Sequence, residues 1–272
     1  MNASSESGAP AVETSALTRR FGALTAVDCV DLAVWQGEIF GLLGANGAGK
    51  STMMKMLTTL LPPTSGSARV GGFDIARKPA EVRRRIGYVP QLLSADGALT
   101  GFENLRLSAE LYGLPRAQRA ERIADALGFM GLADAARKLV RTYSGGMVRR
   151  LELAQAMLHR PAILFLDEPT IGLDPVARHS VWDRLRDLRS TYGMTVLITT
   201  HDMEEAEALC DRIAILHAGR IAVVGRSDEL RAALGPAATL DDVFAHYAGG
   251  GMTEGGDFAG TVRTRRTVRR LG

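Results

Sequence analysis

Residues 44–51, Gly-Ala-Asn-Gly-Ala-Gly-Lys-Ser, have the types and spacing of a phosphate-binding loop (P-loop). Glycines let successive backbone N–H groups point at a polyphosphate, and a following helix N-terminus adds partial positive charge. The Lys50 amine would reach the β- and γ-phosphates, and the Ser51 hydroxyl would be a Mg²⁺ ligand. The alternative is a plain glycine-rich turn before a helix. The complete match favours a nucleoside triphosphate site made by Gly44, Asn46, Gly47, Ala48, Gly49, Lys50, Ser51 and Thr52.

Two carboxylates follow a second buried strand. Residues 162–166 form an apolar run, and Asp167 and Glu168 come directly after it. Parallel strands deliver their C-terminal residues to one sheet edge, which is also where the P-loop lies. Asp167 is then placed to hold Mg²⁺ and Glu168 to act as general base toward water. The alternative is an acidic helix cap before Pro169.

A second candidate anion site stands at Ser144, Gly145 and Gly146, just before a helical pattern. Serine at a helix start followed by two glycines exposes free N–H groups at the positive end of the helix dipole. Taken alone, these residues are better explained as a serine N-cap with a loose turn.

The elements that must position these residues alternate between strands and helices, which predicts an α/β fold with a mostly parallel sheet. Residues 39–43 precede the P-loop as a buried strand, and a helix over 52–60 should stop at Pro62. Residues 195–199 form another central strand, and residues 213–216 and 220–224 form a hairpin. Residues 69–75 form a further hairpin, and residues 104–140 have a helical pattern with few β-branched residues.

This pattern divides the chain into three parts. Residues 1–13 are expected to be a disordered leader, and residues 14–248 an α/β nucleotide-binding domain with an inserted helical subdomain at about 92–158. Residues 249–272 read as a glycine-rich linker followed by five arginines. That tail is either a solvated end or a segment attracted to anionic lipid headgroups.

Composition narrows the class of protein. The net charge of +3 does not by itself argue for nucleic acid, and the two cysteines suggest reduced thiols. None of the four lysines is followed two positions later by Asp, so the Asn-Lys-x-Asp element that reads guanine is absent and ATP is favoured over GTP. The start of the chain does not resemble a signal peptide, and no apolar run approaches the ~18 residues that would cross a bilayer.

Taken in order, these motifs resemble the ATP-binding subunits of ABC transporters. The motifs follow one another along the chain in the same order as in that family: the P-loop, Gln91, Ser144-Gly-Gly, Asp167-Glu168, Asp174 and His201. The resemblance covers roughly residues 14–248 and implies a P-loop ATPase core, an antiparallel β-subdomain and an inserted helical subdomain. Within the family, the chain is most similar to drug- and antibiotic-resistance exporter ATPases of the daunorubicin-resistance type. It carries Met147 where the family usually has Gln.

The resemblance implies further site residues. Phe21 would stack on adenine, with a core aromatic as the alternative, and Gln91 would contact Mg²⁺ and the lytic water. His201 would hydrogen-bond the γ-phosphate. Asp174 would belong to the catalytic set and, followed by Pro175, is also a strong helix N-cap.

The resemblance also implies partners. Two copies would pair head-to-tail around ATP, with Lys50 of one and Ser144 of the other on a single nucleotide. The dimer would energise a polytopic membrane permease from the cytoplasmic face of the membrane, as a peripheral subunit, with no nucleic acid expected. The open alternative is a soluble ABC-type ATPase acting on nucleic acid or ribosomes. A simple nucleotide kinase would not explain Ser144-Gly-Gly or His201.

Overall fold

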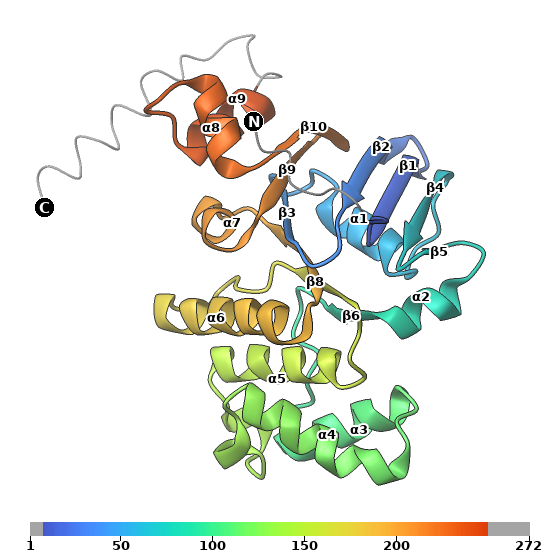
Figure 1. Cartoon of the computed structure of the whole chain (residues 1–272), viewed down its shortest axis with the longest axis vertical. Coiled ribbons are helices and arrows are strands. Elements are labelled where there is room, and N and C mark those ends of the chain that lie inside the picture. Colours follow the sequence, from blue (N-terminus) through green and yellow to red (C-terminus); the bar gives the residue numbers. More distant parts are fainter. Residues whose placement is uncertain (1–7, 250–272) are drawn as a thin grey trace, which may run out of the picture.

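The structure is a computed structural model that describes residues 8–249. It is elongated, with two β-sheets in the upper part and a helical lobe below them (Figure 1). The tail predicted at 249–272, with its arginines, lies outside the described residues except for Gly249, the last residue of α9.

A six-stranded sheet in the order β10-β9-β3-β8-β7-β6 forms the centre of the fold. All neighbours are parallel except β9 and β10, which form the predicted closing hairpin. The four strands β3, β7, β8 and β9 are largely buried because helices cover both faces, which explains their continuous apolar runs. The strands are β3 (Ile39–Leu43), β6 (Ile86–Val89), β7 (Ile163–Asp167), β8 (Thr195–Thr200), β9 (Arg212–His217) and β10 (Arg220–Gly225).

A second, antiparallel sheet has the order β2-β1-β4-β5 and packs over the P-loop side of the molecule (Figure 1). It consists of β1 (Val12–Phe21), β2 (Leu24–Val34), β4 (Ser65–Val70) and β5 (Phe73–Asp74). The expected leader is too long, because β1 already begins at Val12. The side chains of Ala11 and Val12 are buried in the core between this sheet and α1.

Three helices form the lobe inserted between β6 and β7: α3 (Gly101–Leu111), α4 (Arg116–Phe129) and α5 (Gly145–Met157). The helical region begins at Gly101, before the predicted start at residue 104, because Thr100 and Glu103 form a reciprocal capping box. Ile123, Leu127 and Leu151 belong to one apolar cluster that continues into the face of the central sheet.

The remaining helices cover the two faces and the upper end of the central sheet. They are α1 (Lys50–Leu57), α2 (Pro79–Arg85), α6 (Pro175–Tyr192), α7 (Met203–Leu209), α8 (Ser227–Leu234) and α9 (Leu240–Gly249). The expected helix over 52–60 is wrong at both ends: it starts at Lys50 and stops at Leu57, well before Pro62. Thr58 caps it through a bond to the carbonyl of Met54, and Thr59 then turns into the left-handed region at φ 64°. Among residues 8–249, no helix is both long and apolar enough to span a bilayer.

Candidate nucleotide site

The P-loop backbone lies at the end of β3 and leads directly into α1. Gly47 and Gly49 have φ of 82° and 109°, a region that L side chains rarely adopt. A Cβ on Gly49 would lie 2.3 Å from the carbonyl oxygen of Ala26, and one on Gly44 would lie 2.7 Å from that of Leu216. Glycine is therefore required at Gly49 both by conformation and by the close approach of the antiparallel sheet.

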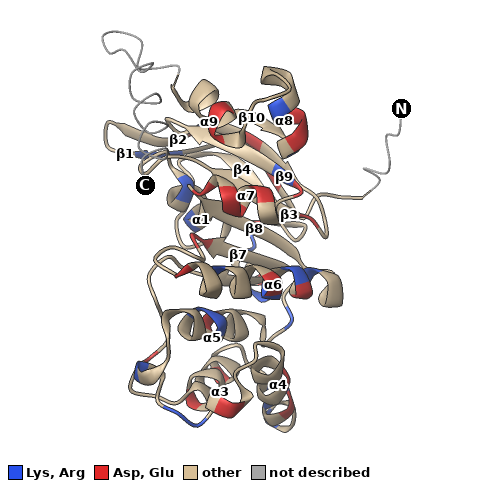
Figure 2. Ribbon diagram, turned by 90° about the vertical axis from the view of Figure 1, so that its left-hand side faces the viewer, with Lys and Arg blue, Asp and Glu red and all other residues tan. Residues whose placement is uncertain are grey.

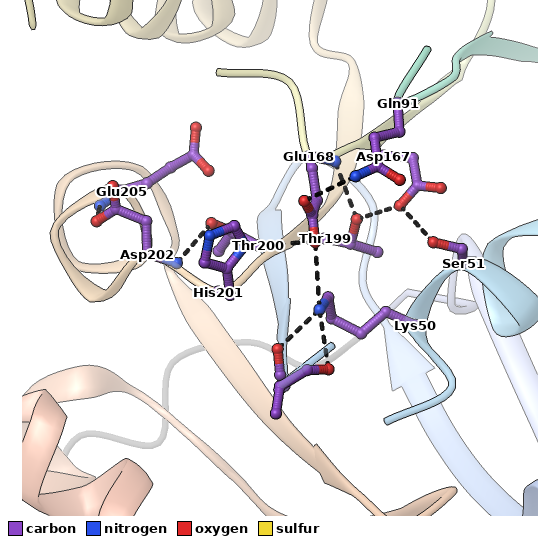
Figure 3. A network of polar contacts seen from close by, with 12 residues as sticks. Lys50, Ser51, Gln91, Asp167, Glu168, Thr199, Thr200, His201, Asp202 and Glu205 are labelled. Carbon is purple, nitrogen blue, oxygen red and sulfur yellow. Dashed lines mark hydrogen bonds and ion pairs between the residues drawn. The ribbon is translucent and has the colours of Figure 1, made fainter. Parts of the chain in front are cut away.

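Lys50 is the first residue of α1, and its side chain is almost fully buried. Its Nζ donates to the carbonyl oxygens of Gly44 at 2.7 Å and Ala45 at 3.3 Å. It also forms an ion pair with Glu168 Oε1 at 3.3 Å, with side-chain exposures of 4% and 6% (Figure 3). The positive charge is therefore held inside the loop, where phosphate oxygens would compete with a carboxylate for it.

Asp167 ends β7 beside the first turn of α1. Its Oδ1 accepts hydrogen bonds from Ser51 Oγ at 3.2 Å and from Thr199 Oγ1 at 2.5 Å (Figure 3). The pairing of β7 with β8 sets Asp167 opposite Thr199. A hydroxyl and a carboxylate on adjacent elements make an oxygen pair of the kind that hard divalent cations prefer.

Glu168 is contacted by two other predicted catalytic residues, Gln91 and His201. Gln91 Nε2 donates to its Oε2 at 3.2 Å, and His201 Nδ1 lies 3.4 Å from its Oε1 (Figure 3). Its backbone N–H donates to both the carbonyl and the hydroxyl of Thr199. Its φ is 49°, in the left-handed region, which costs of order 1–3 kcal/mol for such a residue. The surrounding bonds hold a strained residue with its carboxylate against Lys50.

A cavity of about 490 Å³ opens beside the P-loop. Phe21 lines its mouth and is 44% exposed, with the guanidinium of Arg19 4.6 Å from its ring centroid. The alternative of a core aromatic is therefore wrong, and the ring is available for stacking. The lining also includes Gln91, Glu168 and seven P-loop and α1 residues, namely Ala45, Asn46, Gly47, Gly49, Lys50, Ser51 and Thr52.

Ser144, by contrast, is exposed in the helical lobe, and it does not line this cavity. Its Oγ accepts from the backbone N–H of Met147 at 3.3 Å and caps α5. Gly146 is buried, and a Cβ there would lie 2.8 Å from Cβ of Ala177 in α6. The two glycines thus let α5 start against α6 while Gly145 stays open to solvent.

Asp174 is exposed and caps α6, with Oδ1 accepting from the backbone N–H of Ala177 at 3.0 Å. The N-cap interpretation is correct. The structure does not bring Asp174 to the cavity around Lys50, so within one chain it makes no contact there.

Comparison with known proteins decides the family. The profile described as "ABC transporter" matches residues 27–171, from the antiparallel sheet to just beyond Glu168. This chain belongs to the ABC transporter family. It is therefore an ATP-binding ATPase, and the predicted P-loop core with its antiparallel and helical subdomains is confirmed.

Characterised ABC relatives include resistance and export proteins. The chain is 48% identical over 225 residues to the "Daunorubicin/doxorubicin resistance ATP-binding protein DrrA" of Streptomyces peucetius, covering 83% of this chain and 68% of the relative. It is 40% identical over 219 residues to the "Linearmycin resistance ATP-binding protein LnrL" of Bacillus subtilis, covering 80% and 70%. It is 46% identical over 210 residues to the "Nod factor export ATP-binding protein I" of Cupriavidus metallidurans, covering 77% and 69%.

Solved ABC structures share the fold over most of this chain. An ATP-binding subunit of an ABC transporter superposes with a TM-score of 0.77 at 32% identity, covering 87% of this chain and 98% of that one. The ATP-binding cassette MJ0796, a dimer in a post-hydrolysis state bound to ADP and Pi, superposes with a TM-score of 0.71 at 27% identity, covering 79% and 98%.

Two residues that position the site, Thr199 and Glu205, were not predicted from the sequence. Thr199 bonds both Asp167 and the backbone of Glu168, but a threonine inside an apolar strand gives no signal by itself. Glu205 in α7 is buried, and it accepts from Thr170 Oγ1 at 2.6 Å and Trp182 Nε1 at 3.1 Å. Burial raises the pKa of this carboxyl. It links the segment after Glu168 to the helix after His201.

Proposed function

We propose that this chain is the ATP-hydrolysing subunit that energises export through a separate membrane permease. The observation that carries the proposal is the convergence on Glu168 of Lys50, Gln91 and His201 beside the Ser51–Asp167 pair. These groups sit at the edge of a cavity whose glycine loop suits a polyphosphate.

The residues fit ATP with Mg²⁺. A ring exposed at the cavity mouth, Phe21, suits an adenine face, and the P-loop amides suit the phosphates. Ser51 and Asp167 would hold the cation. Gln91, whose amide donates to Glu168, would be the third ligand. Bound there, the cation supplies charge neutralisation on the β- and γ-phosphate oxygens.

In the proposed reaction, a water oxygen attacks the γ-phosphorus and the bond to the ADP oxygen breaks. Glu168 accepts the proton of that water as general base. Gln91, already bonded to Oε2, orients the carboxylate and the water, and His201 lies on the Oε1 side, where it can donate to the γ-phosphate. Lys50 stabilises the charge on the transferred group.

A second copy would complete the site. The N–H groups around Ser144, Gly145 and Gly146 begin a helix and lie away from the cavity of their own chain. In a head-to-tail dimer, they would bind the γ-phosphate held by the partner's P-loop, with Asp174 at the same interface. ATP would then hold two copies together, and hydrolysis would let them separate.

Export is supported by the relatives' names, of which one refers to Nod factor export and two refer to resistance, to daunorubicin and doxorubicin and to linearmycin. The transported molecule would be a drug, an antibiotic or a lipid-like compound, selected by the permease. The chain would act as a peripheral subunit at the cytoplasmic face of the membrane.

Action on nucleic acid or ribosomes, the competing function, has less support. Acidic and basic positions are interspersed along helices such as α6 rather than gathered by sign (Figure 2). Arg178, Arg184 and Arg186 of that helix are each paired with a carboxylate. Nucleic-acid surfaces instead concentrate free cations on one face.

The proposal is tested by tagging the chain, expressing it in its native membranes and identifying what purifies with it after gentle solubilisation. We expect a stoichiometric protein with several membrane spans. Recovery with ribosomal or DNA-associated proteins, and without such a partner, would contradict the transport role and leave the ATPase untouched.

A further inference from the structure

A buried ion pair in α5 lies behind Gln91. Arg149 Nη1 and Glu152 Oε2 are 2.9 Å apart, and the two side chains are only 3% and 1% exposed. Burying such a pair costs desolvation that Coulomb attraction alone does not reliably offset, so its remaining hydrogen bonds matter. None of the catalytic roles assigned above involves either residue.

Both members of the pair bond the segment 90–94, which contains Gln91. Arg149 donates from Nη1 to the carbonyl oxygen of Pro90 at 2.9 Å and from Nη2 to that of Gln91 at 3.1 Å. Glu152 Oε1 accepts from the backbone N–H and the hydroxyl of Ser94. The segment is thus bonded to α5 at its start and at its end.

Between these two anchors, the segment bulges into solvent. Leu92 and Leu93 are 82% and 59% exposed, while the side chain of Gln91 turns inward to Glu168 Oε2. The backbone of Gln91 is therefore held by α5 while its amide contacts the proposed base. The helix that carries Arg149 is also the one whose first turn presents Ser144 and Gly145.

We propose that Arg149 and Glu152 form a strap that positions Gln91 on Glu168 and ties that contact to the orientation of α5. The two are positioning residues, because neither touches the cavity. A rotation of α5 that moves Ser144 would move the carbonyl of Gln91 with it. The alignment of Glu168 would then depend on whether the start of α5 is docked on a partner copy. This inference rests on the proposed role of Glu168.

Replacing both members by Met removes the strap without leaving a lone buried charge. The full-length chain carrying R149M/E152M should lose about tenfold in kcat, while KM for MgATP and nucleotide affinity stay within about twofold. Arg149→Lys is the milder second variant, because an ammonium keeps the charge but lacks the fixed fork with which the guanidinium bonds the two carbonyls and Glu152 together. It should fold even if the double variant does not, and it should show a smaller loss of kcat in the same direction.

A double-mutant cycle that combines the strap variants with Gln91→Ala separates a positioning role from general destabilisation of the fold. If the strap acts through Gln91, adding R149M/E152M or Arg149→Lys to Gln91→Ala should lower kcat by less than about twofold more. Thermal unfolding of each variant is followed in parallel. Arg119→Met, which removes an ion pair with Glu110 in the same lobe, is the matched control and should keep kcat within about twofold.

Multiplicative losses in the cycle, or wild-type turnover in Gln91→Ala, would overturn the strap. Glu168→Gln assayed alongside distinguishes failure of the strap from failure of the proposed base. If Glu168→Gln abolishes turnover and the cycle is multiplicative, the strap fails alone. If Glu168→Gln turns over normally, the proposed base fails, and the strap fails with it as a device for aligning that base.

Discussion

The nucleotide cavity and the start of α5 are both proposed phosphate sites, yet they are organised in opposite ways. Around the cavity, Lys50 and Glu168 are buried and paired to each other. At the start of α5, Ser144 and Gly145 are exposed, and the Ser144 side chain caps the helix by accepting a hydrogen bond from Met147 N–H. The side chains of the first region are paired with one another within one chain, whereas those of the second are exposed to solvent.

This difference indicates which parts of the reaction one chain can carry out. Nucleotide binding depends on contacts already made between β3, β7, β8 and α1. The α5 start gains a role only when a second surface meets it, because its amides do not line the cavity of their own chain. Substitutions in the first region should therefore act within a chain, and those in the second should act across chains.

The largest effect is expected from Glu168→Gln. Turnover should fall roughly 10²–10⁴-fold, the usual contribution of a positioned base, while ATP still binds. ATP should also hold the variant as a dimer, seen by size-exclusion chromatography with light scattering. Glu121→Gln, exposed on α4, serves as the control. Normal hydrolysis by Glu168→Gln would remove the base from the proposed mechanism.

Lys50→Ala should weaken nucleotide binding itself, roughly 10- to 100-fold, since charged hydrogen bonds contribute about 1.5–3 kcal/mol. Fluorescent-nucleotide titration measures the change. Lys55 lies on the exposed side of the same helix, so the control variant Lys55→Ala should bind the nucleotide with normal affinity. Unchanged affinity in Lys50→Ala would show that the cavity beside the P-loop is not the triphosphate site.

Mixing two inactive chains tests whether the α5 start acts on the P-loop of another copy. Lys50→Ala and Ser144→Arg each disable both sites of their own dimer, but a mixed dimer would keep one intact site. Co-expression in equal amounts should restore roughly a quarter of wild-type turnover, because half of the dimers are mixed and each has one working site of two. Purification through two different tags isolates the mixed species. No activity in that species would contradict head-to-tail pairing.

The smallest effect concerns the pH dependence of stability at Glu205. Because burial raises the pKa of this carboxyl in the folded state, the folded chain binds the proton more tightly than the unfolded chain. Its contribution to stability is therefore full at low pH and is lost as pH rises through the folded pKa. Glu205→Gln should reduce that loss, measured as a flatter dependence of Tm on pH above about 4.5. An identical slope in both chains would show that Glu205 does not titrate in this range.

Motifs that depend on local geometry were predictable from sequence. The P-loop, the Asp167-Glu168 pair and both hairpins follow from glycine placement and strand periodicity, and the fold they imply is confirmed. Element ends were less predictable. The Thr58 cap ends α1 early, and burial of Val12 starts β1 early.

Residues that act across the fold gave no readable signal. Thr199 works through strand register, and Arg149 reaches a segment 58 and 59 residues away along the chain. A buried threonine or arginine has the same appearance in sequence whatever it contacts. Such long-range contacts depend on how the helical lobe docks on the sheet, which no local pattern encodes.

The left-handed backbone of Glu168 has a consequence for directed evolution. Glycine would adopt φ 49° without the strain that a glutamate carries there. Glycine at this position would, however, leave the buried Lys50 ammonium without its carboxylate partner, and breaking a buried pair costs about 3–5 kcal/mol, more than the strain that is relieved. A screen that rewards only heat resistance should therefore keep the glutamate, because the ion pair that holds its carboxylate at the cavity also stabilises its strained backbone.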